Sequence, residues 1–213
     1  QREDERWEVL TTHGQIYIAD QLMIGAGSSK AVWDNLKKLG HKIVTPVPSL
    51  FTFNSKDERI KGLSGISLPN ATVQVAASDL EASGPLLITH WGFSGPAILR
   101  LSAWGARELN DRFYRFPIMI NWIGRDEDEV LADFNEEKKH SGKKRIGNHA
   151  HYGIPLRLWK SMVAGAGIKS TATWGDLSGK DLKHLVSELC CAVFQISGKS
   201  TFKDEFVTAG GVD

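Results

Sequence analysis

The chain has 213 residues, and its 41% hydrophobic content is enough to build a sizeable core in one large domain or two small ones. Its 26 Lys and Arg residues nearly balance 25 Asp and Glu residues, for a formal net charge of +1. This composition argues against a disordered chain and against a global field that would attract nucleic acid or an anionic membrane.

The two cysteines, Cys190 and Cys191, are adjacent within an apolar run. A disulfide between neighbours is strained, so we expect two buried free thiols, which fits a cytoplasmic location. No apolar run approaches the roughly 20 residues that span a bilayer, and no secretion signal opens the chain, so we expect no membrane partner. Because the chain starts at Gln1 and stops after a strand-like run, we expect an interior piece of a longer protein.

The first part of the chain predicts a β-hairpin, a further strand and a helix. These elements are expected at residues 7–18, 21–24 and 31–39. The glycine-rich turn Gly25-Ala26-Gly27-Ser28-Ser29 joins the strand to the helix, with Ser28 or Ser29 as the N-cap. Gly40 is the expected end of the helix.

Beyond residue 45, short β-prone runs separated by turn signals give way to helical periodicity and then return to strand. The predicted strands are 66–68, 72–76, 86–89, 117–123, 191–196 and 205–208. Ser94-Gly95-Pro96 is expected to open one helix, with Ser94 as its N-cap, and the other predicted helices are 127–139, 155–164 and 180–189.

The stretch from Thr89 to Pro96 combines a strand end, a histidine and a helix start. His90 could act as a general acid or base near neutral pH, and the free N–H groups of the helix start favour an anion or oxyanion. The catalytic candidates are therefore His90 and Ser94. The alternative is structural, with His90 tying down the loop through a hydrogen bond and Ser94 serving only as the N-cap.

Two pairs of glycines, Gly25 with Gly27 and Gly210 with Gly211, follow predicted strands. Glycine allows backbone to approach a flat cofactor, but it also marks ordinary tight turns.

A basic run follows the helix predicted at 127–139, and we interpret it as a solvated helix end and loop. It consists of Lys138, Lys139, His140, Lys143, Lys144 and Arg145. His149 and His151 lack further ligands at a recognised spacing, so no metal site is expected.

Six segments, in this order, resemble one family. They are Gly27-Ser28-Ser29, Leu39-Gly40-His41-Lys42-Ile43, Pro46-Val47-Pro48-Ser49-Leu50, Leu63-Ser64-Gly65-Ile66-Ser67-Leu68, Thr89-His90-Trp91-Gly92-Phe93-Ser94-Gly95-Pro96 and Thr208-Ala209-Gly210-Gly211-Val212. The family is that of bacterial NAD(P)/FAD-dependent oxidoreductases of the aminoacetone-oxidase type or bile-acid-inducible type. Its glycine-rich loop for the ADP part of FAD is not in this sequence.

The resemblance implies an α+β fold made of a β-barrel-like inserted domain with a small helical subdomain, beside a remnant of the flavin-binding domain. The implied parts are 1–45 of the FAD-binding domain, 46–125 of the β-rich domain, 126–189 as the helical subdomain, 190–206 as the return strand, and 207–213 back in the FAD-binding domain. By resemblance, Gly25, Gly27, Ser28, Gly210, Gly211 and Val212 lie near FAD, and His90 and Ser94 line the substrate side.

The function expected from this resemblance is that the domain covers the flavin and shapes the pocket of a small-molecule substrate in an FAD-dependent oxidoreductase, with NAD(P)H as a possible donor. The piece alone is expected to lack cofactor and activity, its partner being the rest of its own polypeptide. Nucleic acid is not the favoured partner. Two alternatives stay open: an RNA- or protein-binding module that uses the barrel and the 138–145 basic run, and a purely structural or dimerisation domain.

Overall fold

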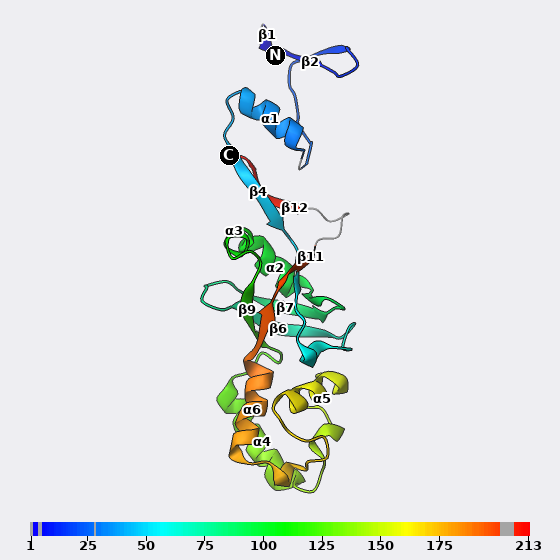
Figure 1. Cartoon of the computed structure of the whole chain (residues 1–213), viewed down its shortest axis with the longest axis vertical. Helices are drawn as coiled ribbons and strands as arrows, with labels where there is room; N and C mark the ends of the chain where they lie inside the picture. Colours follow the sequence, from blue (N-terminus) through cyan, green and yellow to red (C-terminus); the bar gives the residue numbers. More distant parts are fainter. Residues whose placement is uncertain (1, 4–5, 28, 201–206) are drawn as a thin grey trace. The chain divides into compact units, whose positions relative to one another are not determined.

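A computed structural model describes residues 2–3, 6–27, 29–200 and 207–213, and the chain divides into two compact units. The central unit is Pro46–Gly210, and the terminal unit consists of Gln1–Thr45 with Gly211–Asp213. The central unit is therefore an insertion in the terminal unit, which contains both ends of the chain (Figure 1).

The terminal unit begins with a three-stranded sheet of β1 (Arg2–Glu3), β2 (Arg6–Leu10) and β3 (Ile16–Ala19). The antiparallel β2–β3 pair confirms the predicted hairpin, and α1 (Lys30–Lys38) confirms the predicted helix. Helix α1 is followed by its C-cap Leu39 and by Gly40, whose φ of 93° lets the amide of His41 donate to the carbonyl of Leu36. Ser29 occupies the N-cap position without a side-chain hydrogen bond, and Ser28 lies outside the described residues.

The strand predicted at 21–24 is wrong, because this run has no regular secondary structure. Its apolar side chains face solvent, with Met23 93% exposed and Ile24 47% exposed. An apolar run becomes a strand where it has a core to cover, and among residues 6–27 and 29–45 no side chain is buried. As described, the terminal unit lacks a hydrophobic core of its own.

The central unit is built on a seven-stranded sheet with the strand order β10-β9-β6-β7-β8-β5-β11, and its neighbouring strands pair antiparallel. The strands are β5 (Thr52–Asn54), β6 (Ser67–Val75), β7 (Glu81–Ile88), β8 (Gly92–Ser94), β9 (Phe116–Asn121), β10 (Ala192–Ile196) and β11 (Gly198–Ser200). Only Ser197 separates the two edge strands β10 and β11 in the chain, so the sheet is curled, without a closed barrel of paired strands. A separate two-stranded sheet joins β4 (Ile43–Ser49) and β12 (Val207–Val212).

Strand β6 combines the strands predicted at 66–68 and 72–76. The pairing register with β7 shifts between Leu68 and Ala71, on either side of Pro69-Asn70. Proline interrupts a ladder without ending the strand where the chain can bulge. Leu68 and Ala71 are both buried, so the shift keeps apolar residues on the inner face. The turn signals that separate the two predicted strands thus mark an irregularity inside one strand.

Aromatic side chains fill the interior of the curled sheet. Phe93, Phe194 and Trp122 are at most 1% exposed. The ring centroids of Phe93 and Phe194 lie 5.0 Å apart, and those of Trp122 and Phe194 lie 5.7 Å apart, both in edge-to-face arrangements. Such pairs add about 0.5–1.5 kcal/mol each beyond the burial of area. They fix the spacing of β8, β9 and β10.

Helix α2 (Pro96–Trp104) packs on β7 and begins at the predicted proline, but its N-cap is Gly95 and not Ser94. Gly95 has a φ of 95°, and a Cβ at this position would lie 2.8 Å from the carbonyl oxygen of Pro85. This geometry excludes a side chain at the N-cap position, which is residue 95. Ser94 is instead the last residue of β8, opposite Leu87. A short helix, α3 (Ala106–Asp111), is additional to the predicted elements.

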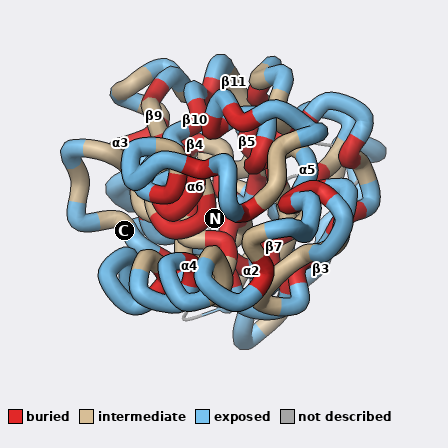
Figure 2. Tube along the Cα trace, turned by 90° about the horizontal axis from the view of Figure 1, so that it is seen from below, coloured by how far each residue is buried: buried red, intermediate tan, exposed pale blue. Residues whose placement is uncertain are grey.

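A helical part is inserted between β9 and β10. Its helices α4 (Glu127–Ser141), α5 (Leu156–Gly165) and α6 (Gly179–Cys190) confirm the three predicted there. Two 3-10 turns, η2 (Ile146–Asn148) and η3 (Trp174–Asp176), lie in the connections. Figure 2 shows buried residues on the inward face of α6 and exposed residues on the outward face of α4.

Gly92 allows β8 to lie close against the end of β5. Its φ is 146°, and an added Cβ would lie 2.2 Å from the carbonyl oxygen of Phe53. Gly92→Ala should therefore reduce the free energy of unfolding by about 2–3 kcal/mol through overpacking and backbone strain. Gly179→Ala, where no atom lies within 4 Å of the new methyl, is the control and should change it by less than about 0.5 kcal/mol. Urea unfolding measures both, and equal midpoints would contradict the close approach of β8.

Candidate functional site

A cleft on the central unit surrounds the turn between β7 and β8. It consists of two adjoining hollows of about 560 and 780 Å³ that share Ser55, Lys56 and His90. The first hollow continues along residues 56–64, which include the 3-10 turn η1 (Glu58–Ile60). The second continues past Trp91 and Arg115 to the end of β10. We call the two together the His90 cleft.

The side chains around the second hollow suit a ligand that combines a flat ring with a negatively charged group. His90, Lys56 and Arg115 are exposed, and Trp91 is 61% exposed. Within the described residues, Lys56 and Arg115 have no ion-pair partner, and no acidic side chain lines the second hollow. An exposed indole offers a stacking surface, and the two cations can hold a phosphate.

The turn that carries His90 and Trp91 is held by its neighbours. The amide of Trp91 donates to Oγ1 of Thr89 at 3.2 Å, and the amide of Ser55 donates to the carbonyl of Trp91 at 2.9 Å. The side chain of His90 has no hydrogen bond to any described residue, so the loop is tied down by Thr89. His90 is thus free to contact a ligand.

One wall of the cleft is clamped by Arg59. Its guanidinium donates to Asp57 at 2.8 Å, to both carboxylate oxygens of Glu188 on α6 at 2.7 and 2.9 Å, and to the carbonyl of Val193. It also lies 4.1 Å from the ring centroid of Phe194. Nε and Nη2 of Arg59 donate side by side to the two carboxylate oxygens of Asp57, a planar bidentate pairing that is specific to arginine. The wall at 56–62 is therefore joined to α6 and β10 through one side chain.

Ser94 does not lie on the cleft. It is half-buried in β8, and neither hollow includes it. Nothing in the described residues brings the side chains of His90 and Ser94 to one cavity. Trp91 and Arg115 are cleft residues that the sequence did not single out, although Trp91 follows His90 directly.

The terminal unit brings together three of the residues expected near a flavin. Gly25, Gly27 and Val212 line one hollow of about 460 Å³, whose other walls are apolar side chains such as Trp7 and Trp33, together with His41. Gly210 and Gly211 lie on β12 with φ values of 125° and 123°. Ser28 lies outside the described residues.

This hollow fits the flat, apolar part of a cofactor better than its phosphates. No protein atom lies within 4 Å of the Cβ positions of Gly25, Gly27 or Gly211, so packing within the unit does not require glycine there. The open backbone and the indole walls leave room for a ring. Among the described residues that line the hollow, none is lysine or arginine, and His41 is the one titratable side chain, so this hollow offers no permanent cation to a pyrophosphate.

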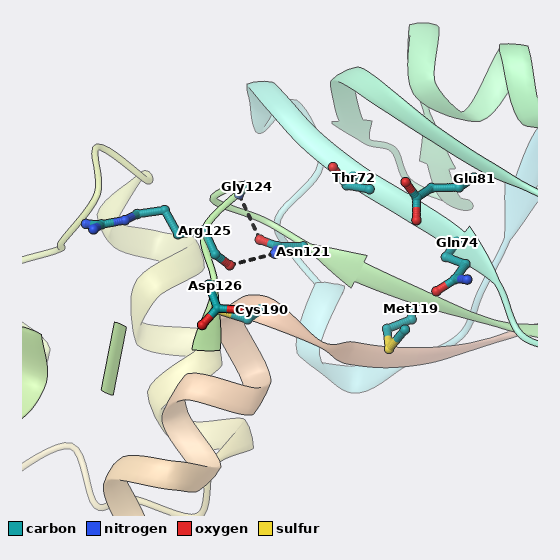
Figure 3. Close-up of a pocket in the computed structure, with 9 residues that line it drawn as sticks. All are labelled: Thr72, Gln74, Glu81, Met119, Asn121, Gly124, Arg125, Asp126 and Cys190. Carbon is teal, nitrogen blue, oxygen red and sulfur yellow. Dashed lines mark hydrogen bonds between the residues drawn. The ribbon is translucent and has the colours of Figure 1, made fainter. Parts of the chain in front are cut away.

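A third hollow, of about 370 Å³, lies where β6 and β9 meet the helical part (Figure 3). Asn121 closes the adjoining turn, because its side chain accepts from the amide of Gly124 at 2.7 Å and donates to the carbonyl of Arg125 at 2.9 Å. Cys190 lines this hollow, but burial raises the pKa of its thiol to about 12. Cys190 is buried and Cys191 is half-buried, and both are free thiols. The raised pKa keeps Cys190 from acting as a thiolate nucleophile.

His149 and His151 belong to two different environments. His151 is half-buried against Trp159 and Trp174, with ring centroids 5.2 Å away in each case, and burial lowers its pKa. His149 is exposed beside it. Among residues 2–3, 6–27, 29–200 and 207–213, no group of three or more His, Cys, Asp or Glu side chains could hold a metal ion. In the same residues, no helix combines the length and apolarity needed to cross a membrane.

Comparison with known proteins gives both a family and named relatives. The family model described as "HI0933-like protein barrel and H2TH domain" matches residues 47–207. The protein named ribosomal RNA dihydrouridine synthase from Haemophilus influenzae (strain ATCC 51907 / DSM 11121 / KW20 / Rd) is 27% identical over 194 residues, which cover 90% of this chain and 45% of that protein. The protein of the same name from Escherichia coli (strain K12) is 26% identical over 196 residues, covering 90% of this chain and 46% of that protein. The chain spans about half the length of these curated relatives.

The Arg59 clamp predicts a pH dependence of stability. Hydrogen bonds from Arg59 hold the pKa of Asp57 below its ordinary value of 3.8. The stabilisation that the Arg59–Asp57 pair contributes is therefore complete above about pH 4. It is lost as pH falls through the lowered pKa of Asp57 in the folded state. Arg59→Met should destabilise by about 2–3 kcal/mol at neutral pH and should flatten this acid-side loss.

Arg125→Met is the matched control, because Arg125 pairs with Glu129 and Asp133 at an exposed site. Exposed pairs contribute little to stability, because solvent screens their attraction. Thermal unfolding of both variants between neutral pH and about pH 2 measures the difference. If the two variants were equally stable, the clamp would not hold the cleft wall.

Proposed function

This chain belongs to the HI0933-like family, which is associated with FAD-binding oxidoreductases, and on that premise we propose that it is the substrate-side inserted domain, with its flanking segments, of an FAD-dependent oxidoreductase. The observation that carries the proposal is the terminal unit without a core, in which Gly25, Gly27 and Val212 meet at one open apolar hollow. The remainder of a longer polypeptide, as in relatives about twice this length, would cover the exposed apolar side chains of that unit.

The residues of this chain have a limited part in holding the cofactor. Gly25, Gly27, Gly211 and Val212 would let backbone lie against the flat ring, while residues outside this sequence would hold the phosphates. When bound, FAD supplies hydride-transfer chemistry, with NAD(P)H as the proposed donor. The narrower likeness to aminoacetone-oxidase-type or bile-acid-inducible-type flavoproteins belongs to this proposal too.

For the substrate, we infer a base in ribosomal RNA rather than the small molecule that the sequence suggested. The named relatives support this inference, and so does the His90 cleft, where an exposed indole stands beside two unpaired cations. Conversion of uridine to dihydrouridine adds one hydride and one proton across a carbon–carbon double bond, so it needs a two-electron donor and a proton donor. Trp91 would stack on the base, Lys56 and Arg115 would hold its phosphates, and His90 would supply the proton. Ser94 stays a candidate only through the family resemblance.

The first test compares this chain with the longer protein of its own source. Each is incubated with FAD and desalted, and its visible absorbance is measured. The longer protein should retain yellow flavin and this chain should not. In the longer protein, Gly25→Val should lower the flavin occupancy, because its Cβ meets no protein atom within 4 Å and its methyl groups would take up room in the hollow. A longer protein that stays colourless would contradict the oxidoreductase assignment.

The second test addresses the substrate. In the flavin-loaded longer protein, Trp91→Ala should lower kcat/KM for ribosomal RNA about fivefold or more, since stacking contributes about 1–3 kcal/mol per base. Reduction of the flavin by NAD(P)H should not change. Trp104→Ala is the matched control, because Trp104 is also highly exposed, at 65%, but lies on α2 away from the cleft. Unchanged turnover in Trp91→Ala and His90→Asn would favour a purely structural or dimerisation role for this domain.

A further inference from the structure

Charge is sharply divided along the helical part. Residues 126–137, the N-cap and first turns of α4, contain seven Asp and Glu residues and no Lys or Arg. Residues 138–184 contain ten Lys and Arg residues and only two acidic ones. Those two, Asp176 and Asp181, are engaged in capping boxes with Thr173 and Ser178. The near-zero net charge of the whole chain conceals this separation.

The backbone brings two parts of the basic segment side by side. The loop that follows α4 pairs with the loop that precedes η3 through an antiparallel bridge between Arg145 and Thr173. The amide of Trp174 donates to the carbonyl of Lys144 at 3.0 Å, and the amide of Gly175 donates to that of Gly142 at 2.8 Å. We call these two segments, 142–149 and 167–175, the paired loops.

A buried aromatic core fixes the paired loops from below. Nε1 of Trp159 donates to the carbonyl of Ile146 at 2.7 Å. Ile146 is fully buried, Trp174 is 2% exposed and Ile168 is 7% exposed. Each loop therefore contributes anchors to one core, and their polar residues are held outward on a rigid base. A preordered surface loses little conformational entropy on binding.

The outward side chains carry positive charge that no described residue neutralises. Lys143, Lys144, Arg145 and Lys169 are all exposed. None of the ion pairs formed by described residues involves these four side chains. By contrast, the preceding Lys139 pairs with Glu136 at 2.6 Å. Exposed Asn148, Ser170 and Thr171 place hydrogen-bonding groups between the cations.

We propose that the paired loops bind the phosphate backbone of structured RNA and so deliver the substrate to the His90 cleft, an inference that rests on the function proposed above. Cations interleaved with hydroxyl and amide groups suit phosphate and ribose oxygens. Helix α5, which enters the second loop, contacts the cleft wall: Arg157 donates to the carbonyl of Gly62, and Ser161 to that of Arg59. The two sites therefore share one packed framework.

Other anionic partners fit the paired loops less well. An interfacial membrane surface needs large apolar side chains beside its cations, and in the helical part the only large hydrophobic residue counted as exposed among those described is Leu156, at 41%. A protein interface is centred on apolar or aromatic anchors, and the exposed residues of the paired loops are polar or small. The paired loops therefore suit a partner that offers phosphate groups rather than apolar contacts.

The experiment uses the flavin-loaded longer protein and ribosomal RNA transcribed in vitro, with the dissociation constant measured as a function of salt. Lys143→Gln/Lys144→Gln should raise the dissociation constant about tenfold at moderate salt and should reduce the slope of log K against log salt by about 1.4–1.8, for two lost phosphate contacts. Lys180→Gln/Lys183→Gln removes the same charge from exposed positions on α6 and should change both quantities much less. Thermal unfolding verifies that both variants are folded.

An equal loss of affinity in both double variants would overturn the proposal, and so would unchanged RNA binding in Lys143→Gln/Lys144→Gln. Binding to vesicles of phosphatidylglycerol and phosphatidylethanolamine in preference to RNA would also overturn it, in favour of a membrane surface. Failure of the proposed function is distinguishable, because a protein that binds RNA through the paired loops but neither holds flavin nor reduces RNA supports this inference while contradicting the enzymatic one.

Discussion

Arg59 is the constraint on which the geometry of the central unit depends. One guanidinium satisfies Asp57 beside η1, Glu188 on α6 and the carbonyl of Val193 on β10, while its face covers Phe194 in the sheet core. Removing its charge would leave the carboxylates of Asp57 and Glu188 without this partner in a partly desolvated place. Because the same segment forms a wall of the His90 cleft, the position of the cleft relative to the helices is set by an ion pair and not by hydrophobic contact alone.

In the proposed function, the curled sheet and the helical part have different roles. The sheet carries the cleft, with Trp91 and Arg115 at its rim, and the helical part carries the paired loops. In the same proposal, the terminal unit would offer its glycines and exposed apolar side chains to the rest of a longer polypeptide. Each part uses a different property: shape and stacking at the cleft, charge at the paired loops, and unburied apolar area in the terminal unit.

Periodicity predicted most helices and strands, because amphipathic segments such as α4 and β10 meet one core and show it in sequence. It failed where tertiary context decides. Residues 21–24 are apolar but have no core to cover, and Ser94 reads as a cap although the close approach to Pro85 requires Gly95. From the sequence, the basic run at 138–145 is interpreted as a solvated helix end. Lys169, which lies on the second of the paired loops, is far from this run along the chain, so the sequence does not group them. Trp91 was visible in the sequence, but its exposure beside Arg115 depends on how β8 and β9 are arranged.

The helical part leaves the sheet from β9 and returns at β10, and these two strands are antiparallel neighbours with Ile120 opposite Ala192. The central unit as a whole begins on β4 and ends on β12, which also pair with each other. Each insertion thus has the stem of a hairpin, and in each case a short turn could close that stem. Because each insertion starts and ends on paired strands, a binding segment can be inserted or exchanged at the turn. The pairing of the surrounding strands does not change. If the proposed flavin chemistry holds, it could in this way be directed to new substrates by replacing one inserted unit.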